Sequence, residues 1–443
     1  MQTMQVAFPW PRYFRRFLEI WGKVFSGYAL HSLHLVPLGM ILTFILFMPS
    51  TMVPAGQGKL AIQESGNAVR QLVLSAGFMI AMVGLLFRGE RILIQAYRQK
   101  LMFIFLGFTL LSIGWSDAPW VALKRWSQFA GMLAIGWCAL GKRGSMSGIL
   151  ELLRGIFTVC LLASIATVVA KMPSAFDPYT GAWTGIHGHK NTLGQVAALT
   201  FALWAPVIVA KKNWQQRLVG AAIVFLSIIV AWKSGSVSSQ FILAGLIGTW
   251  ALMSLPIHFA YKILLVPIPL LGFLFWYLNF PTFTISDFVL TQFERDATLT
   301  GRTILWPYIL EQVDKHFFFG VGYNSFWIGS NQTAHSVTST IGWDAGQAHN
   351  GYIDILNEIG FVGALLFLLI LFQVAVRTVR IYRQNQFFGM TISLILLSQI
   401  MLNLSESSFC RGTSPGWFVF LMIYAALALV PRNAPRLWRL QNR

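Results

Sequence analysis

Long apolar runs separated by short polar segments dominate the chain. A helical run needs about 20 residues to cross roughly 30 Å of hydrocarbon. The pattern predicts twelve such helices, near residues 30–50, 70–88, 100–115, 120–141, 148–170, 191–210, 216–232, 237–255, 260–280, 352–376, 387–405 and 414–431. The strict alternation typical of membrane strands is absent, so we expect an all-α polytopic bundle of about twelve transmembrane helices.

Composition supports the membrane class. Hydrophobic residues make up 56% of the chain and charged residues only 11%, whereas about a quarter of the residues in a soluble globular domain are charged. The three cysteines, Cys138, Cys160 and Cys410, show neither a disulfide framework nor metal-ligand spacing. We therefore expect no structural metal.

The formal net charge of +18 is explained by topology. Most Lys and Arg residues fall in the termini and in alternate loops, which is the positive-inside pattern. It places both termini in the cytoplasm and requires no nucleic-acid partner. We expect an interfacial arm over residues 1–28, one transmembrane bundle over 29–431, and a basic cytoplasmic tail over 432–443.

One external loop, residues 281–350, is far longer than the others. Segments of this length between helices are usually functional or disordered. Its aromatic content and a helix-like stretch from Arg302 to His316 favour a folded external cap. No repeat relates the two halves of the chain, which disfavours most secondary transporters.

Polar residues gather where the even-numbered helices begin, at the external face. The segments are "WSDAPWVALKRW" (115–126), "GIHGHKNTLGQ" (185–195), "KSGSVSSQ" (233–240), "QAHNGYIDILNE" (347–358) and "ESSFCRGTSPGW" (406–417). Helix N-termini contribute unpaired N–H groups and about half a positive charge each. Together with Lys190, Lys233, Arg295, Arg302 and Arg411, they predict a phosphate-binding site at the outer membrane boundary.

Several of these motifs resemble those of a known superfamily. "GHKNTLG", "GRTILW", "GVGYNSFW" and "AHNGYIDILNEIG", with "WSDAP" and "NLSES", are similar to motifs of the O-antigen ligase and Wzy-type polymerase superfamily, and most similar to ExoQ-like exopolysaccharide polymerases. The resemblance spans about residues 110–420. Its most specific element is the pair His349 and Asn350, followed by Gly360.

The resemblance implies a function, a location and partners. Such proteins transfer glycans from undecaprenyl diphosphate to a hydroxyl group, without nucleotide sugar, metal or cofactor, on a GT-C-like glycosyltransferase architecture. It implies the periplasmic face of a bacterial inner membrane. The expected partners are an undecaprenyl-diphosphate-linked oligosaccharide and membrane lipid, with a flippase and a chain-length regulator.

The chemistry of the residues agrees with that implication. A lipid diphosphate is a good leaving group, so neutralising its charge matters more than protonating it. The acceptor hydroxyl must lose a proton, and histidine is the usual base near neutral pH. We expect His349 to be that base, with Glu406, Asp354 and Glu358 as further catalytic candidates. The substrate-binding candidates are Arg302, Arg295, Lys190, Lys233, His189, Asn191, Asn350, Tyr323 and Arg411.

Each candidate also has a structural interpretation. His349 could cap its helix, and His189 could belong to a turn. Carboxylates within a membrane are costly unless paired or wetted, so Asp354 and Glu358 suit either function or an interhelical bond. Many superfamily members have an arginine where this chain reads "SGSVSSQ". Here Lys233 is the nearby cation, without bidentate geometry.

Three functions remain open from the sequence. The first is a polymerase that joins lipid-linked repeat units, and the second is a ligase that transfers glycan to lipid A core or protein. The third is a non-enzymatic transporter or export partner. Polar residues gathered on one side of the membrane favour an enzyme, since a transporter needs a path across it.

Overall fold

A computed structural model describes most of the chain. It covers residues 68–86, 97–139, 146–211, 213–258, 302–328, 331–341, 345–412 and 414–427, with a few positions between 261 and 272. The predicted arm over 1–28, the tail over 432–443, the span near 30–50, nearly all of that near 260–280, and Arg295 lie outside the described residues. Within these ranges the regular structure is helical, apart from one isolated bridge between Phe176 and Trp183.

Ten of the predicted spans coincide with helices. The helices are α4 (Ala68–Leu86), α6 (Lys100–Leu111), α7 (Pro119–Ala139), α8 (Met146–Val169), α9 (Lys190–Ala210), α10 (Trp214–Lys233), α11 (Val237–Ser254), α17 (Gly351–Gln384), α18 (Gln386–Leu402) and α19 (Pro415–Leu427), with α15 (Arg302–Lys315) and α16 (Gln332–Ile341) between them. The all-α class is confirmed for the described residues. The count of twelve and the GT-C-like architecture stay predictions.

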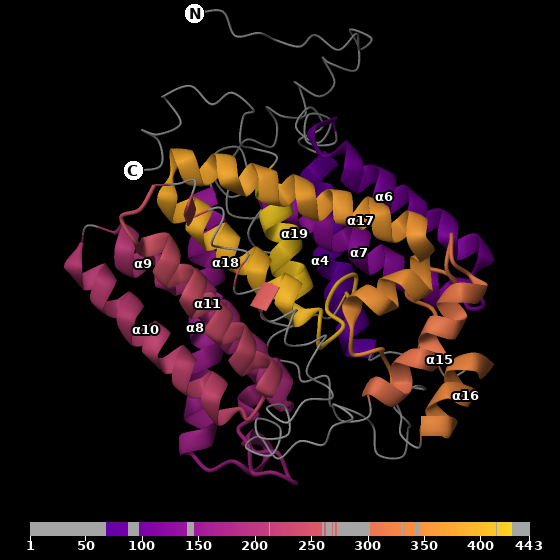
Figure 1. The fold of residues 1–443 in the computed structure, drawn as a ribbon, viewed down its shortest axis with the longest axis horizontal. Helices are drawn as coiled ribbons and strands as arrows, with labels where there is room; N and C mark the ends of the chain where they lie inside the picture. Colours follow the sequence, from indigo (N-terminus) through magenta and orange to yellow (C-terminus); the bar gives the residue numbers. More distant parts are fainter. Residues whose placement is uncertain are drawn as a thin grey trace, which may run out of the picture.

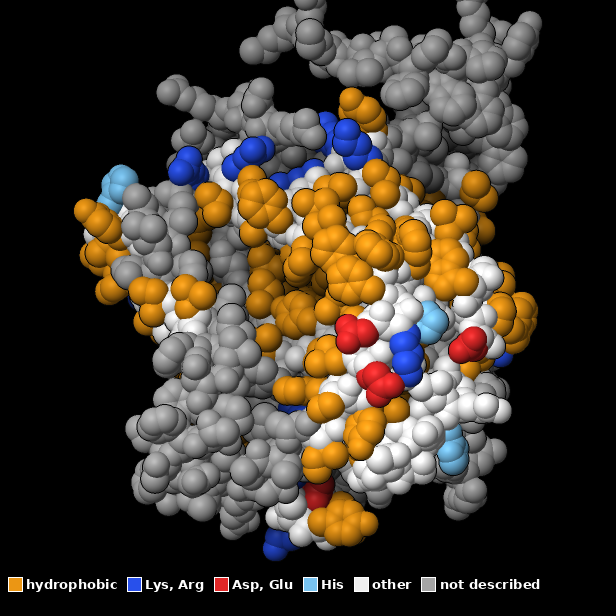
Figure 2. All heavy atoms as spheres, turned by 45° about the vertical axis from the view of Figure 1, so that its right-hand side comes forward, with side chains coloured by type: hydrophobic (Ala, Val, Ile, Leu, Met, Phe, Trp, Pro, Cys, Tyr) orange, Lys and Arg blue, Asp and Glu red, His pale blue; other side chains and the backbone are white. Residues whose placement is uncertain are grey.

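The helices suit a lipid bilayer. Five described helices, α8, α9, α10, α11 and α17, are long and apolar enough to cross a membrane, and α18 and α19 are shorter apolar helices. Figure 2 shows a broad apolar band with Lys and Arg side chains gathered along one edge and mixed charges toward the other. The protein is therefore a membrane protein.

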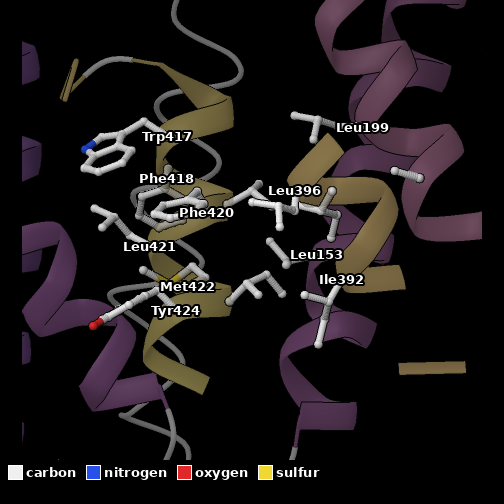
Figure 3. Close-up of a cluster of buried hydrophobic side chains, with 14 of the residues drawn as sticks. Leu153, Leu199, Ile392, Leu396, Trp417, Phe418, Phe420, Leu421, Met422 and Tyr424 are labelled. Carbon is white, nitrogen blue, oxygen red and sulfur yellow. The ribbon is translucent and has the colours of Figure 1, made fainter. Parts of the chain in front are cut away.

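The helix α19 forms the centre of the bundle. Every residue from Pro415 to Leu427 is buried, as expected for a helix that is apolar on all sides. It packs against α7, α8, α9, α17 and α18. Figure 3 shows Phe418 and Phe420 of α19 in one cluster with Leu153 of α8 and Leu396 of α18. This packing joins the α8–α11 group, at the left in Figure 1, to α4, α6, α7 and α17.

The long helix α17 extends from the polar motif to the basic end of the bundle (Figure 1). The continuous part after Gly360, residues 361–384, would span about 36 Å, slightly more than the hydrocarbon thickness. Phe361, Leu365 and Phe372 are exposed on it as lipid-facing residues. Arg380 and Arg383 are exposed near its C-terminus, so His349 and these arginines lie at opposite ends of one helix.

A break at Gly360 divides α17 in two. Gly360 has φ 64° and ψ −172°, a conformation open mainly to glycine. The carbonyls of Asn357 and Glu358, which lose their helical donors there, accept from Val321 N and Gly322 N at 3.0 and 2.9 Å. In return, the N–H groups of residues 361 and 362 donate to the carbonyls of residues 317 and 318 at 2.7 and 3.1 Å. The break thereby ties the cap, the described part of the 281–350 loop, to the bundle.

The described part of the 281–350 loop contains two helices and a small core of its own. The expected helix from Arg302 to His316 appears as α15. A small hydrophobic core joins α15 and α16 to the segments around them, through Leu305, Ile309, Phe326, Trp327, Ala334, Val337, Ala345 and Ala348. Because Ala348 belongs to this core, the cap positions the residue next to His349.

Candidate functional site

Glu406 joins three segments that are distant in sequence. Its Oε1 accepts from Arg302 Nη2 at 3.0 Å and from Asn191 Nδ2 at 2.8 Å. Its Oε2 lies 3.2 Å from His349 Nδ1 and accepts from Gln347 Nε2 at 3.1 Å. The cap, the start of α9 and the loop before α17 therefore meet on one carboxylate.

The site is recessed and still open. The side chains of Arg302 and Glu406 are each 15% exposed, and that of His349 is 22% exposed. Burial alone would raise the pKa of Glu406, but the hydrogen bond and charge of His349, with the charges of Arg302 and His189, outweigh it and lower that pKa. Glu406 is consequently an anion that holds a cluster of donors.

The loop between α18 and α19 presents Glu406 because Asn403 organises it. The Asn403 side chain accepts from Ser408 N and Phe409 N at 2.9 and 2.8 Å. The backbone carbonyl of Asn403 accepts from Gly351 N at 2.8 Å. A Cβ on Gly351 would lie 2.1 Å from Asn403 Oδ1, so glycine is required directly after the His349–Asn350 pair.

The helix start supplies the second part of the geometry. Asn350 is the N-cap of α17, and its Oδ1 accepts from Tyr352 N and Ile353 N at 3.0 and 3.2 Å. His349 has φ 51°, which is uncommon for a residue other than glycine. This turn points the imidazole to Glu406 while the helix proceeds into the bundle.

A second ion network lies beneath the first. Arg411 Nη2 lies 3.0 Å from Asp354 Oδ2 and 2.9 Å from Glu358 Oε1. Arg411 Nη1 also donates to Asn324 Oδ1, and Arg125 Nη1 of α7 donates to Asn324 O at 2.5 Å. Burial alone would lower the pKa of Arg411, but the charges of Glu358 and Asp354 outweigh it and raise that pKa above its ordinary value. Arg411 is thus permanently charged and already paired.

Other predicted residues lie around these networks. His189 is the exposed N-cap of α9 and accepts from Asn191 N at 3.2 Å. Lys190 is half-buried, and its charge contributes to lowering the pKa of Asp177. Lys233 is exposed at the end of α10, where its carbonyl accepts from Trp183 N. Tyr323 is 1% exposed and donates to Cys410 O at 3.0 Å, so it joins the cap to the loop before α19.

Residues 189–368 match the family model described as O-antigen ligase. The predicted resemblance is confirmed. The chain is also 27% identical over 280 residues to the exopolysaccharide production protein ExoQ of Rhizobium meliloti (strain 1021). That similarity covers 61% of this chain, which spans 63% of the relative's length.

The matched region includes His349, Arg302 and Asn191 but ends before Glu406. Sequence reasoning selected Glu406 as a candidate without identifying its partners. It missed four residues that the structure places in the two networks, namely Gln347, Trp327, Asn324 and Arg125. Asn324 and Trp327 stand inside the motif "GVGYNSFW" that the resemblance singles out, and Gln347 stands in the polar segment "QAHNGYIDILNE", which was the available signal. Arg125, a cation inside a predicted span, offered a second.

Carboxylates and a histidine lie close together in these networks. No group of three His, Cys, Asp or Glu side chains arranged to hold a metal ion occurs among the described residues. The carboxylate of Glu406 is surrounded by Arg302, Asn191 and Gln347, which are hydrogen-bond donors. The surroundings of this carboxylate therefore favour an anion over a cation.

Proposed function

We infer that this protein is a membrane glycosyltransferase that polymerises undecaprenyl-diphosphate-linked oligosaccharides at the periplasmic face of the inner membrane. The observation that carries the inference is the placement of His349 and Arg302 on the two oxygens of one carboxylate, at 3.2 and 3.0 Å. A base and a phosphate-binding cation are thereby held together at the external end of α17. Both stand in the region that matches the O-antigen ligase family.

His349 acts as the general base in this proposal. Its Nδ1 faces Glu406, so in the tautomer with a proton on Nδ1 the basic lone pair belongs to Nε2. Nε2 takes the proton from the acceptor hydroxyl as the oxygen bonds to the anomeric carbon. The bond from that carbon to the phosphate oxygen breaks, and the lipid diphosphate leaves with the electron pair. Glu406 orients the imidazole and stabilises its protonated form.

Arg302 stabilises the leaving diphosphate. Guanidinium groups bind phosphate oxygens in bidentate fashion and remain charged at every relevant pH. Arg302 contacts Glu406 at 3.0 Å, so donor binding would substitute phosphate oxygens for one carboxylate oxygen. Lys190 and the N-terminus of α9 add positive potential, and Arg295 is a further proposed contact from outside the described residues.

A ligase is the second candidate, because the matching family is described as O-antigen ligase. The two functions differ only in the acceptor. The printed name of the relative, an exopolysaccharide production protein, favours polymer formation. A transporter lacks a comparable observation in its favour.

Reconstitution tests this proposal. Purified protein in liposomes is incubated with undecaprenyl-diphosphate oligosaccharide, with and without added lipid A core, in excess chelator. Laddered products from the donor alone support the polymerase. Products that require lipid A core would replace it with the ligase, and strict dependence on magnesium would contradict metal-independent chemistry.

The His349→Gln variant tests the base in the same assay. Glutamine keeps a hydrogen bond but cannot accept the proton, so turnover is expected to fall roughly 10²–10⁴-fold. Donor binding should remain near that of the unaltered protein. A glutamine variant with full turnover would show that His349 only orients its neighbours.

A further inference from the structure

Asp354 occupies the centre of the second network, away from solvent. Its side chain is 3% exposed and that of Glu358 is 5% exposed. Arg411 pairs with both carboxylates. An acceptor sugar can reach the half-open Glu406 cluster but meets neither of these acids directly. Their function must therefore be exerted through other residues.

The contacts of Asp354 lead to the backbone next to His349. Both carboxylate oxygens accept from Ala348 N, at 3.3 and 3.2 Å. Oδ1 also accepts from Trp327 Nε1 at 2.7 Å. The carbonyl of Ala348 accepts from Trp306 Nε1 of α15 at 3.0 Å. Both peptide groups of Ala348 are thus held, and the second of them belongs to His349.

The hydrogen bonds that hold Ala348 stabilise the unusual backbone conformation of His349. His349 adopts a left-handed backbone conformation, which is unfavourable for a residue with a side chain and persists only where the surroundings over-determine it. Released from Asp354, the loop would relax toward more favourable backbone angles and carry the imidazole away from Glu406. A misplacement of about 1 Å is enough to reduce a reaction rate about 100-fold.

We propose that Asp354, held by Arg411, is a positioning residue that fixes the turn at Ala348 so that His349 faces the acceptor. This inference rests on the proposed function and assigns Asp354 a role other than that of proton acceptor. Arg411 serves here as the ion-pair partner that holds the Asp354 carboxylate in place, at 3.0 Å. Trp327 and Trp306 complete the restraint from the external cap.

The Asp354→Asn substitution separates the two roles because it preserves shape and removes charge. The amide offers one acceptor oxygen to Trp327 and Ala348 together, and its NH₂ group faces donors. We expect kcat to fall about 10–100-fold, as is typical when supporting contacts around a site are lost. The KM for the lipid-linked donor and the acid limb of the pH profile should be retained.

Two further variants refine the test. Trp327→Phe removes one donor and leaves the charge, so it should reduce kcat less than Asp354→Asn. Combined with Asp354→Asn, it frees the amide oxygen for Ala348 and should recover part of the lost kcat. Glu311→Gln, the same chemical change at an exposed position on α15, is the matched control and should leave kcat unchanged.

Chemical modification supplies a readout that needs no substrate. Diethyl pyrocarbonate reacts with histidine, and mass spectrometry measures its rate at each site. The Asp354→Asn variant should change the rate at His349 several-fold, while the exposed His316 and His335 of the cap react as in the unaltered protein. Unchanged rates at all three residues would overturn the proposal, whether or not the protein is active.

The kinetic outcomes are equally decisive. Full kcat in Asp354→Asn would remove Asp354 from catalysis, and loss of the acid limb would make it the base instead of a positioning residue. Failure of the proposed function has a different signature. In that case His349→Gln stays active, while Asp354→Asn still changes the rate at which diethyl pyrocarbonate modifies His349. The two ideas can therefore fail separately.

Discussion

At the scale of single residues, substitution of Arg302 tests whether its guanidinium group binds the diphosphate of the donor. Arg302→Ala should weaken donor binding by about 1.5–3 kcal/mol, the usual cost of losing a charge-assisted contact. Arg302→Lys should restore only part, because lysine lacks the bidentate fork. Binding of fluorescent undecaprenyl diphosphate to protein in nanodiscs measures the effect.

The ion pair of Arg302 with Glu406 supplies the control for that prediction. If Arg302 acted only by orienting Glu406, Glu406→Gln alone would weaken donor binding as much as Arg302→Ala does. Direct contact predicts that Glu406→Gln alone retains donor binding while Arg302→Ala weakens it. Unchanged donor affinity in Arg302→Ala itself would move the diphosphate to Lys190 and Arg295.

Glu406 should also make stability depend on pH. Its pKa in the folded protein lies below the ordinary 4.5, so its contribution is fully present above about pH 4.5 and is lost as the pH falls through the lower folded value. The gap in Tm between the unaltered protein and Glu406→Gln should therefore shrink as the pH falls below about 4.5. The exposed Glu311→Gln should show no such pH-dependent gap.

At the scale of elements, the break in α17 depends on two glycines facing each other. A Cβ on Gly360 would lie 2.5 Å from the backbone of Phe318, and one on Gly320 would lie 2.4 Å from the backbone of Glu358. Both residues have positive φ, at 64° and 66°. The cap can approach α17 closely enough to exchange backbone hydrogen bonds only because both side chains are absent.

Gly360→Ala should therefore destabilise the protein by more than about 2 kcal/mol, since it adds strain and a clash with backbone. Thermal unfolding in detergent measures the change. Gly155→Ala on α8 is the control, because a Cβ there meets nothing within 4 Å and alanine favours a helix. An equal Tm for Gly360→Ala and the unaltered protein would show that stability does not depend on a glycine at the break in α17.

At the scale of the whole molecule, the two ends of α17 define a direction across the membrane. The Glu406 cluster lies at its N-terminus and Arg380 and Arg383 near its C-terminus. The positive-inside rule then predicts the cluster outside and the arginines in the cytoplasm. Cys138, Cys160 and Cys410 are buried, so new cysteines can be labelled selectively.

Ser339→Cys on α16 and Arg383→Cys on α17 test that orientation at exposed positions. An impermeant thiol reagent should label Ser339→Cys in intact spheroplasts and Arg383→Cys only after lysis. The reverse pattern would place the cluster in the cytoplasm and overturn the periplasmic assignment. Native cysteines alone should give little label in either case.

The sequence by itself determined the helices. Apolar run length decides whether a segment can cross hydrocarbon, and that property is local, so ten predicted spans coincide with described helices. The same local signals predicted a helix from Arg302 to His316, and the structure has α15 over Arg302–Lys315. The types of residue in the candidate site, a histidine, arginines and carboxylates near helix starts, could also be selected from their motifs.

Only the tertiary structure decided which of these residues meet. Arg302 and His349 stand 104 and 57 positions from Glu406, and Asp354 meets Arg411 across a similar separation. Local patterns carry no information on such pairings, because an ion pair depends on how whole elements pack. The carboxylates looked alike in the sequence, yet packing leaves Glu406 at the opening beside His349 and encloses Asp354 and Glu358 behind it. The roles of these carboxylates differ because each has its own burial and its own partners, and both result from the packing of the cap against α17.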